Sequence, residues 1–107
     1  MTATLIATPR QLSDQFDVLK KQWIKETEHL SSPSEIALHP SYQRIIGLGP
    51  QVIPLLLQEL AKSPNQWFWA LKAITGEDPV PIEHRGRIHA MAKAWLAWGA
   101  ENGWSAE

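Results

Sequence analysis

Apolar residues recur at helical spacing through the middle of the chain, residues 45–76. In its first half they fall at the i, i+3 and i+4 positions that one buried face of a helix requires: Val52, Ile53, Leu56, Leu57 and Leu60. Gly49 and Pro50 suit the residues just before and at the start of this helix. Pro54 conflicts with an interior helical position, so either the helix bends slightly there or the regular helix begins only at that residue.

A second helix is predicted directly after the first. Ser63 suits the N-cap, Pro64 the first helical position, and Gln66 would complete a capping box with Ser63. Gly76 is placed to end the helix in the left-handed conformation. Its apolar stripe consists of Trp67, Ala70, Leu71 and Ile74. Because the link is so short, we expect the two helices to be antiparallel neighbours.

This stretch resembles a HEAT-type helical repeat of the short prokaryotic kind. That family has a first helix with the pattern G-P-x-x-[VI]-P-x-L-x-x-x-L, then a brief turn and an Ala-rich second helix. The matching residues are Gly49, Pro50, Val52, Ile53, Pro54, Leu56, Leu60, Ala70, Leu71 and Ile74. Trp69 stands where such repeats often carry arginine, and the pattern has no second copy. A solenoid needs several stacked repeats. The resemblance therefore implies paired helices of the kind used as binding scaffolds. The segments HPSYQRIIGLG, ITGEDPV and WLAWG also resemble small bacterial proteins, a likeness that implies no function.

The pattern before the central pair predicts a long helix and a short one. The long helix is predicted to have Thr8 as its N-cap, Pro9 in its first turn and Gln11 as the capping-box partner of Thr8. It continues to about Leu30. Its apolar face consists of Leu12, Phe16, Leu19, Trp23 and Leu30. Residues 1–7 carry no helix signal and are predicted to be a flexible leader. Residues 31–34 break the long helix, residues 36–39 form a short connection, and a short helix runs from Pro40 or Ser41 to Gly47.

A proline-containing loop, residues 77–86, follows the central pair and leads to the last helix, residues 87–102. The apolar face of that helix consists of Ile88, Met91, Ala92, Trp95 and Trp98. Gly103 is a plausible C-cap, after which Trp104 would fold back on the last turn. We therefore predict an all-α fold with a single domain, residues 8–107. It would be a compact bundle of four to five helices, with the HEAT-like antiparallel pair packed between the first and last helices.

Composition narrows the class of protein. Hydrophobic content of 44% and charged content of 20% are ordinary for a globular domain. The net charge of −1 removes the main argument for electrostatically driven nucleic-acid binding, and the absence of cysteine excludes disulfides and thiolate sites. No apolar stretch has the roughly 18 residues of a membrane span, and MTATLIATPR lacks the basic region and long apolar run that are typical of a secretory signal. We therefore expect no membrane insertion and a cytoplasmic protein.

The residues that could carry chemistry are not arranged as in known catalytic or metal motifs. His84 and His89 are five positions apart, whereas metal-binding histidines on one helical face are four apart. No serine lies in a nucleophile-elbow pattern, and Gly47-Leu48-Gly49 lacks the third glycine of a phosphate-binding loop. We therefore expect no metal, no cofactor and no enzymatic activity.

Tryptophan is the unusual feature, with six residues in the chain. At ~100° per residue Trp69 lies about 200° from Trp67, so the two cannot face the same core. If Trp67 points inward, Trp69 shares the outer face with Lys72 and Ala73. It would then contact a partner or a second copy of the chain, or be covered by the first or last helix. Trp98 and Trp104 are the next candidates for exposed anchors.

The only dense basic cluster consists of His84, Arg85, Arg87, His89 and Lys93. It could bind phosphate or an acidic partner surface, or simply be a solvated helix start. The favoured function is non-catalytic binding of a protein partner, or self-association, through Trp69, Trp98, Trp104, Lys72, Arg85 and Arg87. An adaptor, an antitoxin or immunity protein, or an assembly subunit would all fit. The alternative is a small nucleic-acid-associated regulator that uses the basic cluster, and an enzyme ranks third.

Overall fold

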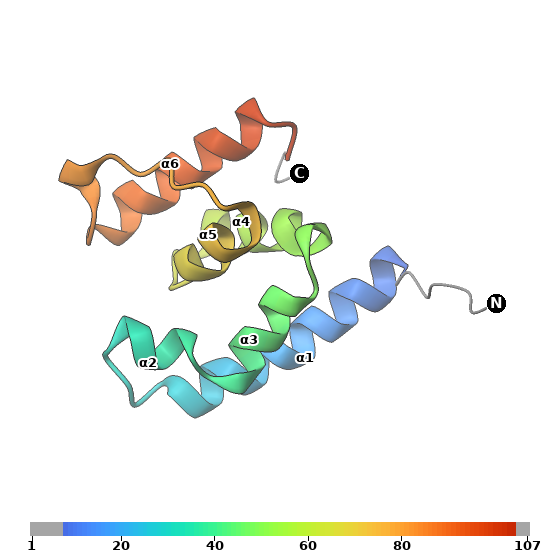
Figure 1. Cartoon of the computed structure of the whole chain (residues 1–107). Coiled ribbons are helices and arrows are strands. Elements are labelled where there is room, and N and C mark those ends of the chain that lie inside the picture. Colours follow the sequence, from blue (N-terminus) through green and yellow to red (C-terminus); the bar gives the residue numbers. More distant parts are fainter. Residues whose placement is uncertain (1–7, 105–107) are drawn as a thin grey trace.

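The computed structural model describes residues 8–104, and within that range it is all-α, as the sequence predicts (Figure 1). Its α-helices are α1 (Pro9–Thr27), α2 (Pro33–Ala37), α3 (Pro40–Gly47), α4 (Ile53–Lys62), α5 (Phe68–Thr75) and α6 (Ile88–Glu101). Two 3₁₀ turns, η1 (Pro50–Val52) and η2 (Ile82–His84), complete the described secondary structure. The predicted flexible leader, residues 1–7, lies outside the described residues.

The predicted start of α1 is confirmed. The Thr8 side chain accepts a hydrogen bond from the Gln11 amide at 3.1 Å, and the Gln11 side chain accepts one from the Thr8 amide at 2.9 Å. The helix ends at Thr27, earlier than predicted, because the chain tightens there into a turn in which the Leu30 amide donates to the Thr27 carbonyl. Leu30 is therefore half-buried beyond the helix, not part of its regular face.

The short helix α2 lies where the sequence predicts a break and a connection. Ser32 caps it, Pro33 occupies its first turn, and the Trp23 indole N–H donates to the Ile36 carbonyl at 2.8 Å. A helix of 5 residues is too short to show a periodic apolar pattern, so its stability depends on contacts with α1 and α3. The described residues thus form six α-helices, where four to five were predicted.

The structure resolves the conflict at Pro54. Residues 50–52 form the 3₁₀ turn η1, and the regular helix α4 begins at Ile53, which places Pro54 in the first turn. Proline is tolerated there because its missing N–H would have no helical partner. The second of the two alternatives is therefore confirmed to within one residue. Gly49, at φ 82° and ψ −169°, makes the sharp entry into this segment.

The predicted start of α5 is wrong. The helix begins at Phe68, not Pro64, and Ser63 makes no capping box, so the link from α4 is residues 63–67 and not a tight turn. The missing cap comes from α3. The Tyr42 hydroxyl accepts from the Ala70 amide in the first turn of α5 at 2.9 Å and donates to the Gln66 carbonyl at 2.8 Å. Burial raises the pKa of the Tyr42 phenol, which keeps this hydroxyl protonated.

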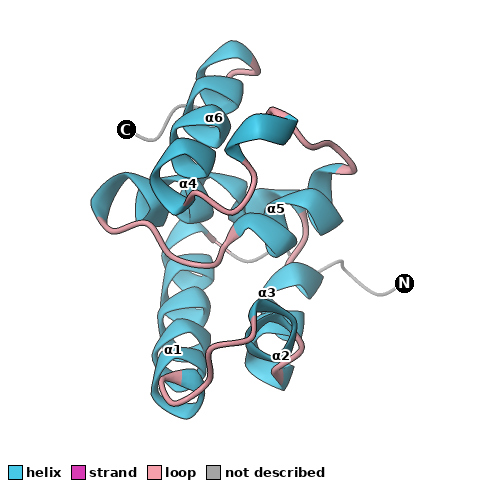
Figure 2. Ribbon diagram, turned by 90° about the vertical axis from the view of Figure 1, so that its left-hand side faces the viewer, coloured by secondary structure: helices cyan, strands magenta, loops and turns pink. Residues whose placement is uncertain are grey.

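The helices are arranged in layers, with α4 and α5 between α1–α3 on one side and α6 on the other (Figures 1 and 2). The closest pairings are α1 with α3, α3 with α5, and α4 with α6, so α3 provides most of the contact between the first helix and the central segment. An aromatic cluster fills the space between α1, α3 and the start of α5. Its members are Phe16, Trp23, Tyr42 and Trp67.

The last helix matches its predicted range to within a residue at each end. Gly103, at φ 79°, ends it in the left-handed conformation, and the Trp104 amide donates to the Gly99 carbonyl at 2.7 Å, which is a Schellman motif. Gly99 packs closely on α4, since an added Cβ would lie 2.6 Å from Leu57 Cδ1. None of the helices in residues 8–104 combines the length and the apolar character that crossing a bilayer requires.

Candidate functional site

Two tryptophans two positions apart have opposite environments at the start of α5. Trp67 is 1% exposed and lies in the aromatic cluster, with its ring centroid 4.5 Å from that of Trp23. Trp69 is 44% exposed. The sequence predicts this divergence from helical spacing, and the structure shows it although Trp67 is the N-cap residue just before α5. Among the described residues, no hydrogen bond involves the Trp69 side chain.

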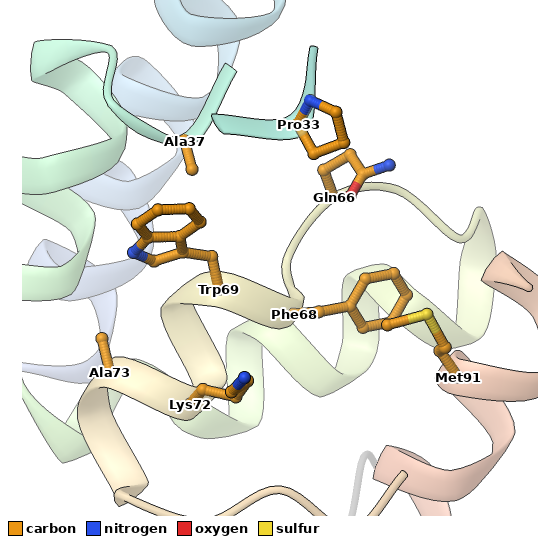
Figure 3. Close-up of a pocket in the computed structure, with 8 residues that line it drawn as sticks. All are labelled: Pro33, Ala37, Gln66, Phe68, Trp69, Lys72, Ala73 and Met91. Carbon is orange, nitrogen blue, oxygen red and sulfur yellow. The ribbon is translucent and has the colours of Figure 1, made fainter. Parts of the chain in front are cut away.

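Trp69 forms one wall of a surface groove of about 490 Å³, which we call the Trp69 groove (Figure 3). In the close-up, the indole lies toward Ala37 of α2, while Phe68 of α5 and Met91 of α6 lie together on the other side. Pro33 and Gln66 line one end. The lining is completed by Lys72 and Ala73 of α5. The groove thus joins three helices and the 63–67 link, and most of its side chains are apolar.

The groove remains open because α2 is short and several of the side chains around the groove are small. The short helix α2 presents only Pro33 and Ala37 to it, and Ala73 leaves space beside Trp69 on α5. The last helix contributes Met91 at the edge. The sequence left open that the first or last helix covers Trp69; in the structure α2 and α6 flank the groove, and Trp69 keeps 44% of its surface exposed.

A small ionic cluster lies beside the groove. Asp78 Oδ2 is 3.5 Å from Lys72 Nζ and 3.2 Å from an Arg85 guanidinium nitrogen. The other oxygen of Asp78 accepts from the Val80 amide at 3.2 Å. The Lys72 and Arg85 side chains are both more than half exposed, so these pairs contribute little to stability.

The loop before α6 reaches the groove through Met91. The Gly86 amide donates to Met91 Sδ at 3.3 Å, and the Met91 amide donates to the Arg87 carbonyl at 2.8 Å. Arg87 is exposed one helical turn before Met91. Of the three predicted basic residues, Lys72 lines the groove, Arg85 shares Asp78 with Lys72, and Arg87 precedes Met91 by one helical turn.

The basic cluster seen in the sequence does not form one surface. His84 and Lys93 line a separate pocket of about 400 Å³ on the face of α6 that carries Ala90, Ala94 and Ala97. Met91 lies about 200° from Lys93 around the helix axis, on the groove side. His84 and Lys93 thus line a different pocket from Lys72, the one cation among the described residues that line the Trp69 groove.

Two of the predicted anchors lie elsewhere. Trp98 is 7% exposed because α6 packs on α4. The Trp98 indole N–H donates to the Glu77 side chain, in the loop after α5, at 3.2 Å. The prediction of Trp98 as an exposed anchor is therefore corrected, because a residue at the edge of the apolar arc is covered by its own chain. Trp104 folds back on α6 through the Schellman motif and packs partly on the core. Neither residue lines the Trp69 groove.

Sequence reasoning missed Pro33, Ala37, Phe68 and Met91 as lining residues. A local signal existed for the first two. Ser32 and Glu35 have capping-box spacing around Pro33, and the structure shows the Glu35 amide bonded to the Ser32 hydroxyl. Phe68 and Met91 lie on different helices, and their meeting depends on the packing of α5 and α6 relative to α4.

The shifted acid–base groups lie away from the groove. Hydrogen bonds from His39 and Gln22 lower the pKa of Glu26 on α1, and His39 also caps α3 by accepting from the Ser41 amide. Glu26 and Tyr42 have shifted pKa values, and neither lines the Trp69 groove. Within residues 8–104, no three histidine or carboxylate side chains gather where they could hold a metal ion.

Comparison with models of protein families, with curated proteins and with solved structures finds no match to this chain. The function is therefore inferred from the residues of the groove themselves.

Proposed function

We propose that this chain is a non-catalytic protein-binding module that holds an apolar segment of a partner protein in the Trp69 groove. The observation that carries the proposal is a tryptophan left 44% exposed beside an apolar groove of about 490 Å³. Large exposed apolar side chains around a concavity are typical of interaction surfaces, and tryptophan is enriched among the residues that contribute most to binding.

The exposed part of Trp69 represents useful binding energy. A tryptophan buries roughly 150–250 Å², so the exposed fraction corresponds to roughly 65–110 Å². At ~25 cal/mol/Å², covering it would contribute roughly 2–3 kcal/mol before the costs of association. That is the magnitude expected of a central anchor in a small interface.

The groove walls are preorganised. Tyr42 fixes the first turn of α5 by its bonds to Ala70, which follows Trp69 in the chain, and to Gln66, which lines the groove. On the opposite side, the Trp23 indole holds α2 through the Ile36 carbonyl. A partner therefore finds the groove already formed, so little binding energy is lost in ordering it.

The resemblance of residues 45–76 to a HEAT-type repeat supports the same proposal, because such helix pairs commonly serve as scaffolds for protein binding. An adaptor, an antitoxin or immunity protein and an assembly subunit are all compatible with it, and a bacterial cytoplasmic setting belongs to the same proposal. A second copy of the chain is the other possible occupant of the groove.

The test is purification of the tagged chain from its native cells, with assay of bound protein and bound nucleic acid. We expect a stoichiometric protein partner that is lost on Trp69→Ala. It should be retained by Val18→Ala, which removes another exposed apolar side chain, 65% exposed on α1 and outside the groove. Light scattering of the purified chain identifies self-association.

Retention of the partner by Trp69→Ala would contradict the proposal. So would a preparation that carries only nucleic acid released by moderate salt, since that behaviour belongs to the alternative reading of the basic residues.

A further inference from the structure

We infer that the partner segment held in the Trp69 groove is acidic, with a carboxylate next to its apolar anchor residues. This inference rests on the proposed protein-binding function and adds the chemistry of the partner to it. Its basis is the charge of the side chains that border the groove.

Lys72 is the one charged side chain among the described residues that line the groove. It comes from α5 one turn after Phe68, and it is more than half exposed. In Figure 3 its amine lies on the side of the groove opposite Pro33 and Gln66. An anchor residue of the partner that packs on Trp69 would place the neighbouring residues of its segment within reach of this amine.

The anion already present does not neutralise the cations around it. Asp78 Oδ2 is shared between Lys72 Nζ at 3.5 Å and Arg85 at 3.2 Å, and the other carboxylate oxygen accepts from the Val80 amide. Two full positive charges therefore face one negative charge. The Lys72 contact is the longer of the two, so Lys72 can turn to a partner carboxylate while Asp78 keeps Arg85.

Arg87 is a further cation in the segment that leads to Met91. It is exposed one turn before Met91, whose side chain lines the groove and accepts the Gly86 amide hydrogen bond. A segment lying along the groove from Lys72 toward Met91 would approach the start of α6, where Arg87 is the N-cap residue.

Two other carboxylates of this region, Glu77 and Glu35, do not line the groove. Glu77 accepts from the Trp98 indole. Glu35 lies about 200° around α2 from Pro33, the residue that lines the groove. An apolar groove with Lys72 as its one charged lining residue in the described part of the chain matches a segment that carries a carboxylate, and such complementarity selects partners and speeds association.

The test is selection of a displayed random-peptide library on the full-length chain, with counter-selection on Trp69→Ala. We expect the enriched peptides to combine a large apolar residue with Asp or Glu within one helical turn of it. The best peptide is then measured by fluorescence anisotropy beside a copy in which each Asp or Glu is replaced by Asn or Gln. We expect the neutral copy to bind about tenfold more weakly.

Charge reversal in the protein gives the matching result. Lys72→Glu should weaken binding of the acidic peptide by about tenfold, whereas Lys21→Glu should leave the affinity for this peptide unchanged. Lys21 makes the same change in net charge at an exposed position of α1 outside the groove. Circular dichroism verifies that each variant is folded, and Trp69→Phe, which keeps an aromatic ring, should retain part of the binding.

The outcomes separate this inference from the function on which it rests. If the enriched peptides require Trp69 for binding but are neutral or basic, the inference of an acidic partner is wrong. The proposed protein-binding function would still hold. A library in which no peptide distinguishes the wild type from Trp69→Ala would overturn both.

Discussion

The aromatic cluster and the Trp69 groove lie on different sides of the same short helix, α5. In the cluster, Trp67 is 1% exposed and its neighbour Tyr42 has both hydrogen-bonding functions of its hydroxyl engaged by the backbone. In the groove, Trp69 is 44% exposed. Burial in the folded chain explains the aromatic residues of the cluster, but it does not explain Trp69 in the groove. The difference indicates that Trp69 serves binding, and the changes below test that division.

The largest effect on folding is expected from Trp67→Ala. The ring of Trp67 contacts those of Phe16, Trp23 and Tyr42, and its removal leaves a cavity among three helices. We expect a loss of about 3–5 kcal/mol in the free energy of unfolding, measured by urea denaturation. A loss below about 1 kcal/mol would show that the cluster does not hold the fold together.

Tyr42→Phe should have the next largest effect. It keeps the ring but leaves the Ala70 amide without its acceptor and the Gln66 carbonyl without its donor. We expect a loss of about 1–3 kcal/mol. Amide hydrogen exchange should accelerate at Ala70, in the first turn of α5, and much less at Ala92 in α6. Equal acceleration at both amides would contradict a local capping role.

Trp23→Phe and Trp95→Phe form a matched pair within the core. Both indoles are almost fully buried, but the Trp23 N–H donates to the Ile36 carbonyl at 2.8 Å, whereas the Trp95 N–H has no partner among the described residues. We expect Trp23→Phe to cost about 1 kcal/mol more than Trp95→Phe in thermal or urea unfolding. The reverse order would mean that the hydrogen bond to α2 contributes nothing to stability.

The smallest effect on folding is expected from Trp69→Ala. Its ring is half exposed, and alanine has a higher helix propensity than tryptophan, by about 0.5 kcal/mol. The free energy of unfolding should therefore change by less than about 1 kcal/mol in the same urea experiment. A loss comparable to that of Trp67→Ala would show that Trp69 is a structural residue and remove its main reason to be called an anchor.

The sequence predicts best those features that are determined by neighbouring residues. The start of α1 depends on Thr8 and Gln11, three positions apart, and the range of α6 follows from a regular apolar face. The left-handed ends at Gly76 and Gly103 are equally local. The different environments of Trp67 and Trp69 also agree with a prediction from their spacing of two residues.

The features that the sequence does not predict depend on contacts between distant segments. The start of α5 is set by Tyr42, which lies 28 positions before Ala70, so the local Ser63 signal was misleading. The burial of Trp98 depends on Glu77 and on the packing of α6 against α4. The groove itself exists only because α2 and α6 are placed on either side of Trp69.

Photo-crosslinking in native cells tests the central claim most directly. A benzophenone amino acid at Ala73, exposed in the groove beside Trp69, is compared with the same residue at Lys21 on α1. We expect position 73 to give one dominant crosslinked protein, absent from position 21 and lost when Trp69→Ala is added. A crosslink that forms equally at both positions, or that persists without the Trp69 ring, would contradict the Trp69 groove as the binding site.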